Sequence, residues 1–309
     1  MSLRLTILGC HSATPRSLAQ PSAQYLEING EHILIDCAEG TQTQLRKFGV
    51  KFSRIRHVFI SHLHGDHFYG LIGLISTFSL LNRQNELHVY GPTGLKEIIQ
   101  LQLKLTKSWI DYPLHFHELN SGKSELIFDS EKIQVRTIPL RHRIYTNGFL
   151  LREKPAPRKL NMEMISKHPE IDICDYQNLK DGKDFTDTKG TVVANDELTH
   201  DPPTPLSYAY CSDTTYSEEV AKVIQNVDLL YHESTFLEQH VDLAETTRHS
   251  TAAQAAKIAS MAGAKKLILG HFSSRYKDTN LFLQEAMEHF AYCELCEAGK
   301  VFEVNNPSG

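Results

Sequence analysis

The chain has 309 residues, of which 41% are hydrophobic and 22% are charged, and its net charge at pH 7 is −5. This composition excludes a disordered or fibrous chain, and the negative charge excludes a general attraction to nucleic acid, so that RNA or DNA binding would need a local basic patch. The 17 histidines are the unusual count, because histidine is the commonest metal ligand and the usual general acid or base at neutral pH.

The first half of the chain predicts strands that alternate with helices. Leu3, Leu5 and Ile7 alternate with polar residues as in a half-buried strand, and Asn29-Gly30 is a strong hairpin signal. The strands predicted here cover residues 3–7, 25–28, 32–36, 57–61, 87–90, 114–119, 133–138 and 148–152. The predicted helices cover residues 41–48, 68–81 and 94–107.

The second half repeats this rhythm after an interruption. Its predicted strands cover residues 207–211, 229–232, 267–270 and 301–304, and its predicted helices cover 217–225, 251–262 and 279–290. Residues 153–203 break the pattern with five prolines and the polar run 181–184. We therefore expect one α/β domain over residues 1–309, in which packed sheets have helices outside and 153–203 is an inserted arm.

Two stretches are locally basic. Residues 151–168 contain five Lys and Arg against two Glu, and five further cations between Arg46 and Arg56 have no acid among them. Each is either a solvated face or a surface for phosphate groups.

The six cysteines and the apolar segments indicate a cytoplasmic protein. Cys10, Cys37 and Cys211 adjoin apolar strand-like runs and are expected to be buried free thiols, and Cys293 and Cys296 form a single C-x-x-C without a second pair. No apolar run approaches the roughly 18 residues of a membrane-spanning helix. The start of the chain, up to Cys10, faintly resembles a lipoprotein cleavage site, but it is too short and predicts a strand instead.

The segment that carries chemistry is SHLHGDH at residues 61–67, directly after a predicted strand. It holds three histidines and an aspartate, which a loop after a strand can divide between two neighbouring metal ions. Nitrogen and oxygen donors of this kind suit Zn²⁺ first, with Mn²⁺ as the alternative. Further ligands must come from elsewhere, and His142, Asp213 and His271 each follow a predicted strand.

This order of motifs resembles the ribonuclease Z (tRNase Z, tRNA 3′-endonuclease) family of the metallo-β-lactamase superfamily. The segments that match are LGCHSATP at 8–15, DCAEGTQ at 36–42, SHLHGDHFYG at 61–70, SDT at 212–214, HEST at 232–235, HST at 249–251 and GHFSSRY at 270–276. Ala38 stands where the family has glycine. The resemblance implies a four-layer αββα metallo-β-lactamase fold with an inserted flexible arm, or exosite, that grips precursor tRNA.

The resemblance also implies the ligand set of two zinc ions per subunit. His62, His64 and His142 would bind one ion, and Asp66, His67 and His271 would bind the other. Asp213 would bridge both ions, and Asp36 would orient the ligand loop from the second shell. The same likeness implies a homodimer in which one subunit's arm serves the other's active site. The arm here lacks the Gly-Pro step usual in bacterial members.

The expected reaction is metal-dependent hydrolysis of a phosphodiester. Two close metals would activate a bridging hydroxide to attack phosphorus, with Asp66 as ligand and proton acceptor. His249, held by Glu233, would protonate the departing ribose 3′-oxygen, and Arg275 and Tyr276 would contact the substrate phosphate. The products would be a tRNA 3′-OH and a trailer with a 5′-phosphate. His249 is open to a simpler role at the start of a helix capped by Ser250 or Thr251.

Two other functions stay open at this point. The first is a metal-dependent phosphodiesterase acting on small phosphodiesters with a degenerate RNA arm. The second is a non-enzymatic RNA-binding protein that kept the fold. The complete set of ligand and loop residues favours the endoribonuclease that removes 3′ trailers from tRNA precursors.

Overall fold

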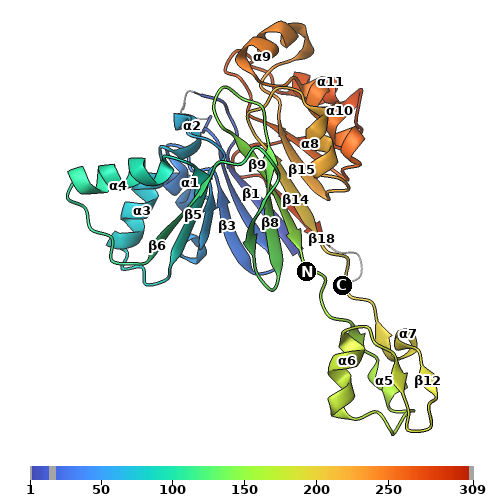
Figure 1. The fold of residues 1–309 in the computed structure, drawn as a ribbon. Coiled ribbons are helices and arrows are strands. Elements are labelled where there is room, and N and C mark those ends of the chain that lie inside the picture. The colour runs from blue at the N-terminus through green and yellow to red at the C-terminus, as the bar shows by residue number, and fades with distance from the viewer. Residues whose placement is uncertain (1, 14–18, 306–309) are drawn as a thin grey trace.

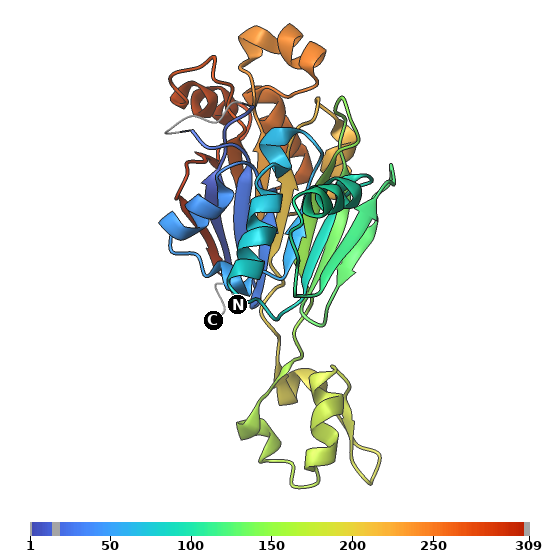
Figure 2. The same ribbon diagram turned by 90° about the vertical axis from the view of Figure 1, so that its left-hand side faces the viewer.

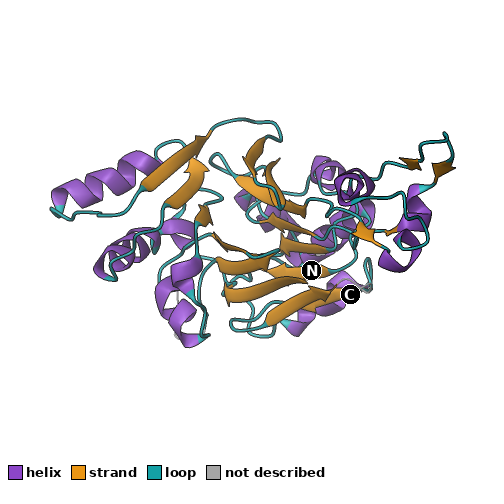
Figure 3. Ribbon diagram, turned by 90° about the horizontal axis from the view of Figure 1, so that it is seen from below, coloured by secondary structure: helices purple, strands orange, loops and turns teal. Residues whose placement is uncertain are grey.

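The computed structural model describes residues 2–13 and 19–305. Two seven-stranded sheets pack face to face, with helices on the outer face of each (Figures 1 and 2). Seen from below, the layers follow one another as helices, sheet, sheet and helices (Figure 3). The predicted α/β class and αββα sandwich are confirmed. Thr14 and Pro15 of the opening motif lie outside the described residues.

The first sheet has the strand order β18-β1-β2-β3-β4-β5-β6. Its strands are β1 (Ser2–Gly9), β2 (Ala23–Ile28), β3 (Glu31–Ile35), β4 (His57–Phe59), β5 (Leu87–Pro92), β6 (Leu114–Leu119) and β18 (Val301–Asn305). The strands β3 to β6 run parallel, whereas β18, β1, β2 and β3 pair antiparallel. The segments after β3 and β4 therefore leave the sheet at the same edge.

The second sheet has the order β17-β16-β15-β14-β9-β8-β7. Its strands are β7 (Leu126–Asp129), β8 (Ile133–Pro139), β9 (Asn147–Glu153), β14 (Ser207–Cys211), β15 (Leu229–Glu233), β16 (Leu267–Gly270) and β17 (Cys293–Leu295). The strands β14 to β17 run parallel, so Asp213, Glu233 and His271 lie at one edge of the sheet. The strand β9 is antiparallel to β14, which places the β8–β9 turn, with His142, at that same edge.

Each predicted helix is present, with one division. The helices beside the first sheet are α1 (Thr41–Lys47), η1 (Phe52–Arg54), α2 (Gly65–Phe68), α3 (Leu71–Leu80) and α4 (Leu95–Leu105). Those beside the second are α8 (Glu218–Val223), η3 (Glu238–His240), α9 (Val241–Thr247), α10 (Ala252–Ala262) and α11 (Asn280–Met287). The helix predicted over 68–81 is present as α3, but it begins three residues later, because Tyr69 and Gly70 form a turn that separates it from α2. A Cβ at Gly70 would lie 2.0 Å from the carbonyl oxygen of Ala38.

Large aromatic and aliphatic side chains fill the layers between these elements. Phe59, Tyr90, Phe149 and Tyr210 belong to one buried cluster that includes residues of both sheets. A second cluster joins the first sheet to its helices. In the described part of the chain, no helix is long and apolar enough to cross a membrane.

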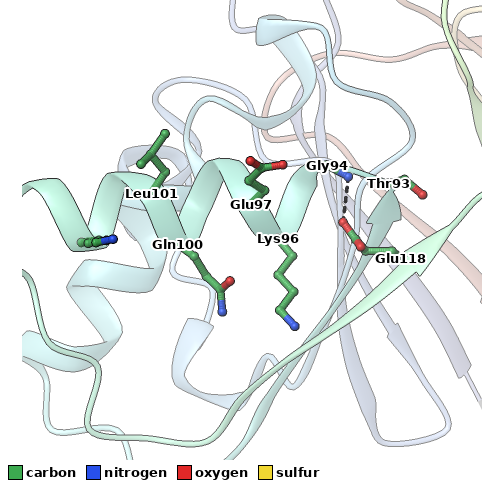
Figure 4. Close-up of a pocket in the computed structure, with 8 residues that line it drawn as sticks. Thr93, Gly94, Lys96, Glu97, Gln100, Leu101 and Glu118 are labelled. Atoms are coloured by element: carbon green, nitrogen blue, oxygen red, sulfur yellow. Dashed lines mark hydrogen bonds between the residues drawn. The ribbon is translucent and has the colours of Figure 1, made fainter.

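The helix α4 begins at a glycine turn beside the sheet. Gly94 has φ = 97°, which favours glycine, and its N–H donates to the carboxylate of Glu118 on β6 at 2.7 Å (Figure 4). These two residues line a pocket with Thr93, Lys96, Glu97, Gln100, Leu101 and Lys104. None of these residues belongs to the predicted site.

The segment between β9 and β14 folds as a small arm below the sandwich (Figure 1). Its elements are β10 (Lys159–Leu160), α5 (Met162–Ile165), η2 (Ile173–Asp175), α6 (Tyr176–Lys180), β11 (Phe185–Thr186), β12 (Val192–Val193), α7 (Asn195–Leu198) and β13 (Thr199–His200). The arm has its own apolar cluster of Ile165, Ile171, Leu179 and Leu198. Arg158, part of the predicted basic stretch, pairs inside the arm with Asp196 and Asp201.

His57 on β4 predicts a loss of stability in mild acid. It is 7% exposed, its ring lies 4.3 Å from that of Phe128, and its Nδ1 has no hydrogen-bond partner. Burial, reinforced by His88 and Arg56, lowers the pKa of His57 to about 4. The unfolded chain, with a pKa near 6.5, binds the extra proton between pH 6.5 and 4, so stability falls as the pH falls through that window. At pH 5 the loss is about 2 kcal/mol.

Urea unfolding at pH 7 and pH 5 measures this effect. His57→Leu should remove about 2 kcal/mol of the difference between the two pH values. His289→Leu, at an exposed position after α11, should leave the difference as in the unaltered chain. Equal pH dependence in His57→Leu and the unaltered chain would contradict the assignment.

Candidate metal centre

The ligand loop begins where β4 ends and runs into α2. Asp36, directly after β3, holds it, because its carboxylate accepts the backbone N–H of Ser61 at 2.8 Å and the Ser61 hydroxyl at 2.9 Å. The same carboxylate accepts the Nδ1–H of His67 at 2.7 Å and the hydroxyl of Tyr210 at 2.6 Å. Asp36 is fully buried and has φ = 55°, a left-handed conformation that a side chain rarely adopts. Buried hydrogen bonds thus hold a strained residue beneath the loop.

The first group of donors contains His62, His64, His142 and Asp213. Their ligand atoms all lie within 4.8 Å of one another. The Nδ1 of His64 is 3.0 Å from the Nε2 of His62 and 3.3 Å from the Nε2 of His142. The Oδ2 of Asp213 faces the same two Nε2 atoms at 3.6 and 3.7 Å. The arrangement collects three imidazoles and a carboxylate around one point.

The second group contains Asp66, His67 and His271, which also lie within 4.8 Å of one another. The other oxygen of Asp213, Oδ1, lies 3.3 Å from the Nε2 of His67 and 3.1 Å from the Nε2 of His271. Each oxygen of Asp213 therefore faces a different group. This is the geometry that a carboxylate shared by two ions requires.

The residues fit a pair of metal ions by their hydrogen bonding. Four of the histidines have a hydrogen-bond partner on Nδ1. These pairs are His62 with Ser61, His67 with Asp36, His142 with the carbonyl of Arg248, and His271 with Thr235. All four Nε2 atoms then face the centre, as metal-binding histidines with a partner on the other nitrogen do. The Nε2 atoms of His67 and His271 are buried and have no hydrogen-bond partner. Unpaired buried nitrogens of this kind are costly without a ligand.

The electrostatics of the centre also favour a cation. Among the described residues, histidines are the only basic side chains that form ion pairs with the carboxylates of Asp36, Asp66 and Asp213. Although burial lowers it, the pKa of His67 is raised well above its usual value by the carboxylates of Asp213 and Asp36. Positive charge is therefore stabilised at this position, and a divalent ion can supply it in place of the proton.

His249 and Glu233 lie beside the two groups of donors. The Nδ1–H of His249 donates to Glu233 at 2.8 Å, and its ring lies 5.0 Å from that of His142 and 5.4 Å from that of His271. Burial lowers the pKa of His249, but the Glu233 carboxylate outweighs burial and raises it to about 9. Glu233 is fully buried and also accepts the backbone N–H groups of Thr214 and Thr235. The N-cap of α10 is Thr251 and not Ser250, so His249 has no role in capping this helix.

Three supporting residues were missed at the sequence level. Thr235 joins Glu233 to His271, because its hydroxyl donates to the Glu233 carboxylate at 2.6 Å and lies 2.9 Å from the Nδ1 of His271. Arg248 makes two hydrogen bonds with His142. The Arg248 carbonyl accepts from the His142 ring, and the Arg248 guanidinium donates to the His142 carbonyl at 2.7 Å. Tyr210 reaches Asp36 across the sandwich. For Thr235 the HEST segment was the available signal; the other two had none.

The two predicted phosphate contacts, Arg275 and Tyr276, lie after His271 in the loop that leads to α11. Arg275 is exposed. The hydroxyl of Tyr276 accepts the backbone N–H of Leu237 at 3.1 Å and lies 2.7 Å from the Nδ1 of His240. Tyr276 thus anchors the segment before α9, and the contact of both residues with a phosphate stays a prediction.

Asp36→Asn is expected to weaken the centre without removing a ligand. The amide cannot accept from both Ser61 and His67 as the carboxylate does, so His67 loses its fixed orientation. We expect a loss of about 10- to 100-fold in metal affinity, measured by competition with a chelator. Tyr210→Phe, which removes one hydrogen bond from the same carboxylate, should cost less. An unchanged metal affinity in Asp36→Asn would contradict the positioning role.

The sequence comparisons identify relatives along nearly the whole chain. Ribonuclease Z of Bacteroides fragilis is 43% identical over 286 residues, which cover 93% of this chain and 94% of the relative. Ribonuclease Z of Cytophaga hutchinsonii is 48% identical over 308 residues, which cover 99% and 97%. A sequence profile described as anti-Pycsar protein Apyc1 matches residues 3–155.

Solved structures agree with this result. The short form of human tRNase Z superimposes with a TM-score of 0.70 at 28% identity, over 98% of this chain and 99% of that one. A metallo-β-lactamase-fold protein from Bacillus subtilis superimposes with a TM-score of 0.69 at 17% identity, over 98% and 100%, which shows the shared fold. With two adjoining sets of metal-binding side chains at one edge of that fold, the chain belongs to the ribonuclease Z family.

Proposed function

We propose that this protein is an endoribonuclease that removes 3′ trailers from tRNA precursors and leaves a tRNA 3′-OH and a trailer with a 5′-phosphate. The observation that carries the proposal is Asp213, whose two oxygens face two adjoining groups of imidazoles and carboxylates. The relatives named ribonuclease Z, which match over nearly the full chain, support the choice of substrate.

The geometry supports an assignment of residues to two Zn²⁺ ions. His62, His64 and His142 would hold one, Asp66, His67 and His271 the other, and Asp213 both. The donor set of nitrogen and oxygen atoms suits Zn²⁺, with Mn²⁺ as the alternative. When bound, such a pair lowers the pKa of a water between the ions and neutralises charge on the phosphate oxygens.

Side chains of this protein would position a metal ligand and protonate the leaving group. Asp66 is fixed by the backbone N–H of Ala13, which donates to its Oδ2 at 2.7 Å. Glu233 accepts from the Nδ1–H of His249, which leaves Nε2 as the nitrogen for proton transfer. We assign to His249 the transfer of a proton to the departing ribose 3′-oxygen, and to Glu233 the orientation of that ring.

The test is cleavage of a 3′-extended tRNA by the purified zinc-loaded protein. The proposal expects a single cut beside the discriminator base, which a chelator and His64→Ala abolish. Hydrolysis of a bis-aryl phosphodiester without any cut in the tRNA would instead identify a small-substrate phosphodiesterase.

The arm lies at the opposite end of the sandwich from this centre. The strand β14 leads from the arm at Ser207 to Asp213, and its five residues alone span roughly 17 Å. In Figure 1 the arm extends below the sheets, while α2 and α9, which flank the centre, lie at the top. We propose a homodimer in which the arm, residues 153–203, holds the tRNA for the partner subunit. A cytoplasmic location accords with six cysteines that are all free thiols.

The charge of the arm limits how it can bind RNA. Residues 153–203 contain seven Lys and Arg against eleven Asp and Glu, and Arg158 is paired with two of those acids. The arm as a whole therefore repels phosphate, and contact must come from local cations and from shape.

Deleting the arm should separate tRNA binding from hydrolysis at the metal centre. Residues 155–203 can be replaced by a short turn, because the backbone N–H of Glu153 donates to the carbonyl of Leu206 at 2.9 Å across the base of the arm. We expect kcat/KM for precursor tRNA to fall by at least about tenfold, or 1.4 kcal/mol. Hydrolysis of a bis-aryl phosphodiester should stay within about twofold, since the centre is intact. Equal losses on both substrates would contradict the role of the arm.

A further inference from the structure

A second group of histidines lies on the first sheet, outside the metal centre. His57 on β4, His88 on β5, and His115 and His117 on β6 point to the face that looks toward the second sheet. The register pairs His57 with His88 and His88 with His115. The ring of His88 is nearly parallel to those of His115 and His117, at centroid distances of 4.8 and 5.3 Å. Phe128 on the edge strand β7 covers His57, and the rings on β6 extend past it into solvent.

Three donor atoms converge at the end of this row. The Oε2 of Glu86 lies 3.4 Å from the Nε2 of His88 and 3.7 Å from the Nε2 of His115, and all three atoms lie within 4.8 Å of one another. Ligands on a tetrahedral Zn²⁺, at 2.0–2.1 Å from the ion, are about 3.3 Å apart. Only a small movement of exposed side chains is needed to bind an ion here. The side chains of Glu86 and His115 are 53% and 47% exposed, so an ion has access.

We propose that Glu86, His88 and His115 form a second site for a divalent transition-metal ion such as Zn²⁺, with water completing the coordination. The supporting contact is on the other nitrogen of His88. The Nδ1 of His88 lies 3.0 Å from the Nε2 of His117, so a proton on that Nδ1 leaves the Nε2 lone pair toward Glu86 and His115. Metal-binding histidines carry such a partner on the far nitrogen.

The protonation of the row agrees with this arrangement. Burial, with His88 and His115 nearby, lowers the pKa of His117, so that His117 is neutral at pH 7 and can accept from His88. Glu86 then supplies the negative charge that a divalent ion favours. Two further titratable groups that face the row, His57 and Tyr90, are uncharged at this pH, since the pKa of His57 is lowered to about 4 and that of Tyr90 raised to about 12, each mainly by burial.

The site would fasten the edge of the sheet. The strand β6 ends the order of the first sheet, and β5 is its one neighbour there among the described strands. His115 lies on β6, whereas Glu86 and His88 lie just before and on β5. An ion held by all three side chains would cross-link β5 and β6, and this role does not involve the catalytic reaction.

The experiment is a count of bound metal. The protein is dialysed against Zn²⁺, and the ions per chain are measured by plasma mass spectrometry for the unaltered chain, His115→Ala, Glu86→Gln and, as a matched exposed histidine, His289→Ala. We expect His115→Ala to bind one ion fewer and Glu86→Gln to bind that ion at least about tenfold more weakly. His289→Ala should bind as the unaltered chain does.

Two further measurements separate this site from the metal centre. His64→Ala should keep the ion that His115→Ala loses, and His115→Ala should hydrolyse a bis-aryl phosphodiester at the rate of the unaltered chain. Mg²⁺, which prefers oxygen ligands, should not compete for the site. An equal number of zinc ions in His115→Ala, Glu86→Gln and the unaltered chain would overturn the proposal, whether or not the enzyme cleaves tRNA.

Discussion

Asp213→Ala is expected to lower kcat/KM on 3′-extended tRNA by about 10³-fold or more. Altering a residue that only orients a metal ligand costs 10- to 100-fold, and Asp213 faces both groups of ligands at once. Its removal leaves the Nε2 atoms of His62 and His142 on one side, and those of His67 and His271 on the other, without the carboxylate between them. Both ions should therefore be bound more weakly.

The measurement pairs activity with metal content. Zinc per chain should fall in Asp213→Ala, and the loss should extend equally to a bis-aryl phosphodiester, because the defect lies in the centre and not in tRNA binding. Asp228→Asn is the matched control. Asp228 is another buried aspartate of the second sheet, at the other end of β15, where it accepts from Ser207 and pairs with Lys265. Full zinc content and activity in Asp213→Ala would show that Asp213 does not bridge the two ions.

The fold could be predicted well where local patterns decide it. Alternation and turn signals located the long strands, such as β1 and the β2–β3 hairpin. Among the elements that were missed outside the arm, β7, β17 and α9 are short or polar and depend on packing against their neighbours. The turn at Gly70 could not be predicted, because the Gly70 N–H donates to the carbonyl of Cys37, which is distant in sequence, at 2.9 Å.

The site was predictable because its residues follow strands. Parallel strands bring their carboxyl ends to one edge, so residues after β3, β4, β14, β15 and β16 meet there without being near in sequence. The hydrogen bonds that orient them were less predictable. Tyr210 lies within a strand of buried residues, and only the packing of two sheets brings its hydroxyl to Asp36. The peripheral histidines were also missed, since nothing in the spacing of His88 and His115 indicates that β5 and β6 are neighbours.

His249→Gln is expected to lower kcat on precursor tRNA by about 10²- to 10⁴-fold, the range for loss of a general acid. The ring of His249 lies near those of His142 and His271, and Glu233 accepts from its Nδ1–H, so Nε2 is the nitrogen left to deliver a proton. Glutamine keeps a polar side chain of similar reach but cannot protonate a ribose oxygen. Zinc content should not change, since His249 is not among the seven proposed ligands.

A substrate that needs no proton distinguishes this role from a structural one. A precursor whose scissile 3′-oxygen is replaced by sulfur releases a thiolate, which leaves without protonation. His249→Gln should cleave that precursor nearly as fast as the unaltered enzyme, whereas Asp213→Ala should remain inactive on it. His289→Gln, at an exposed histidine, should behave as the unaltered enzyme on both substrates. An equal loss on the oxygen and sulfur substrates would mean that His249 holds the substrate or the loop in place and does not deliver the proton.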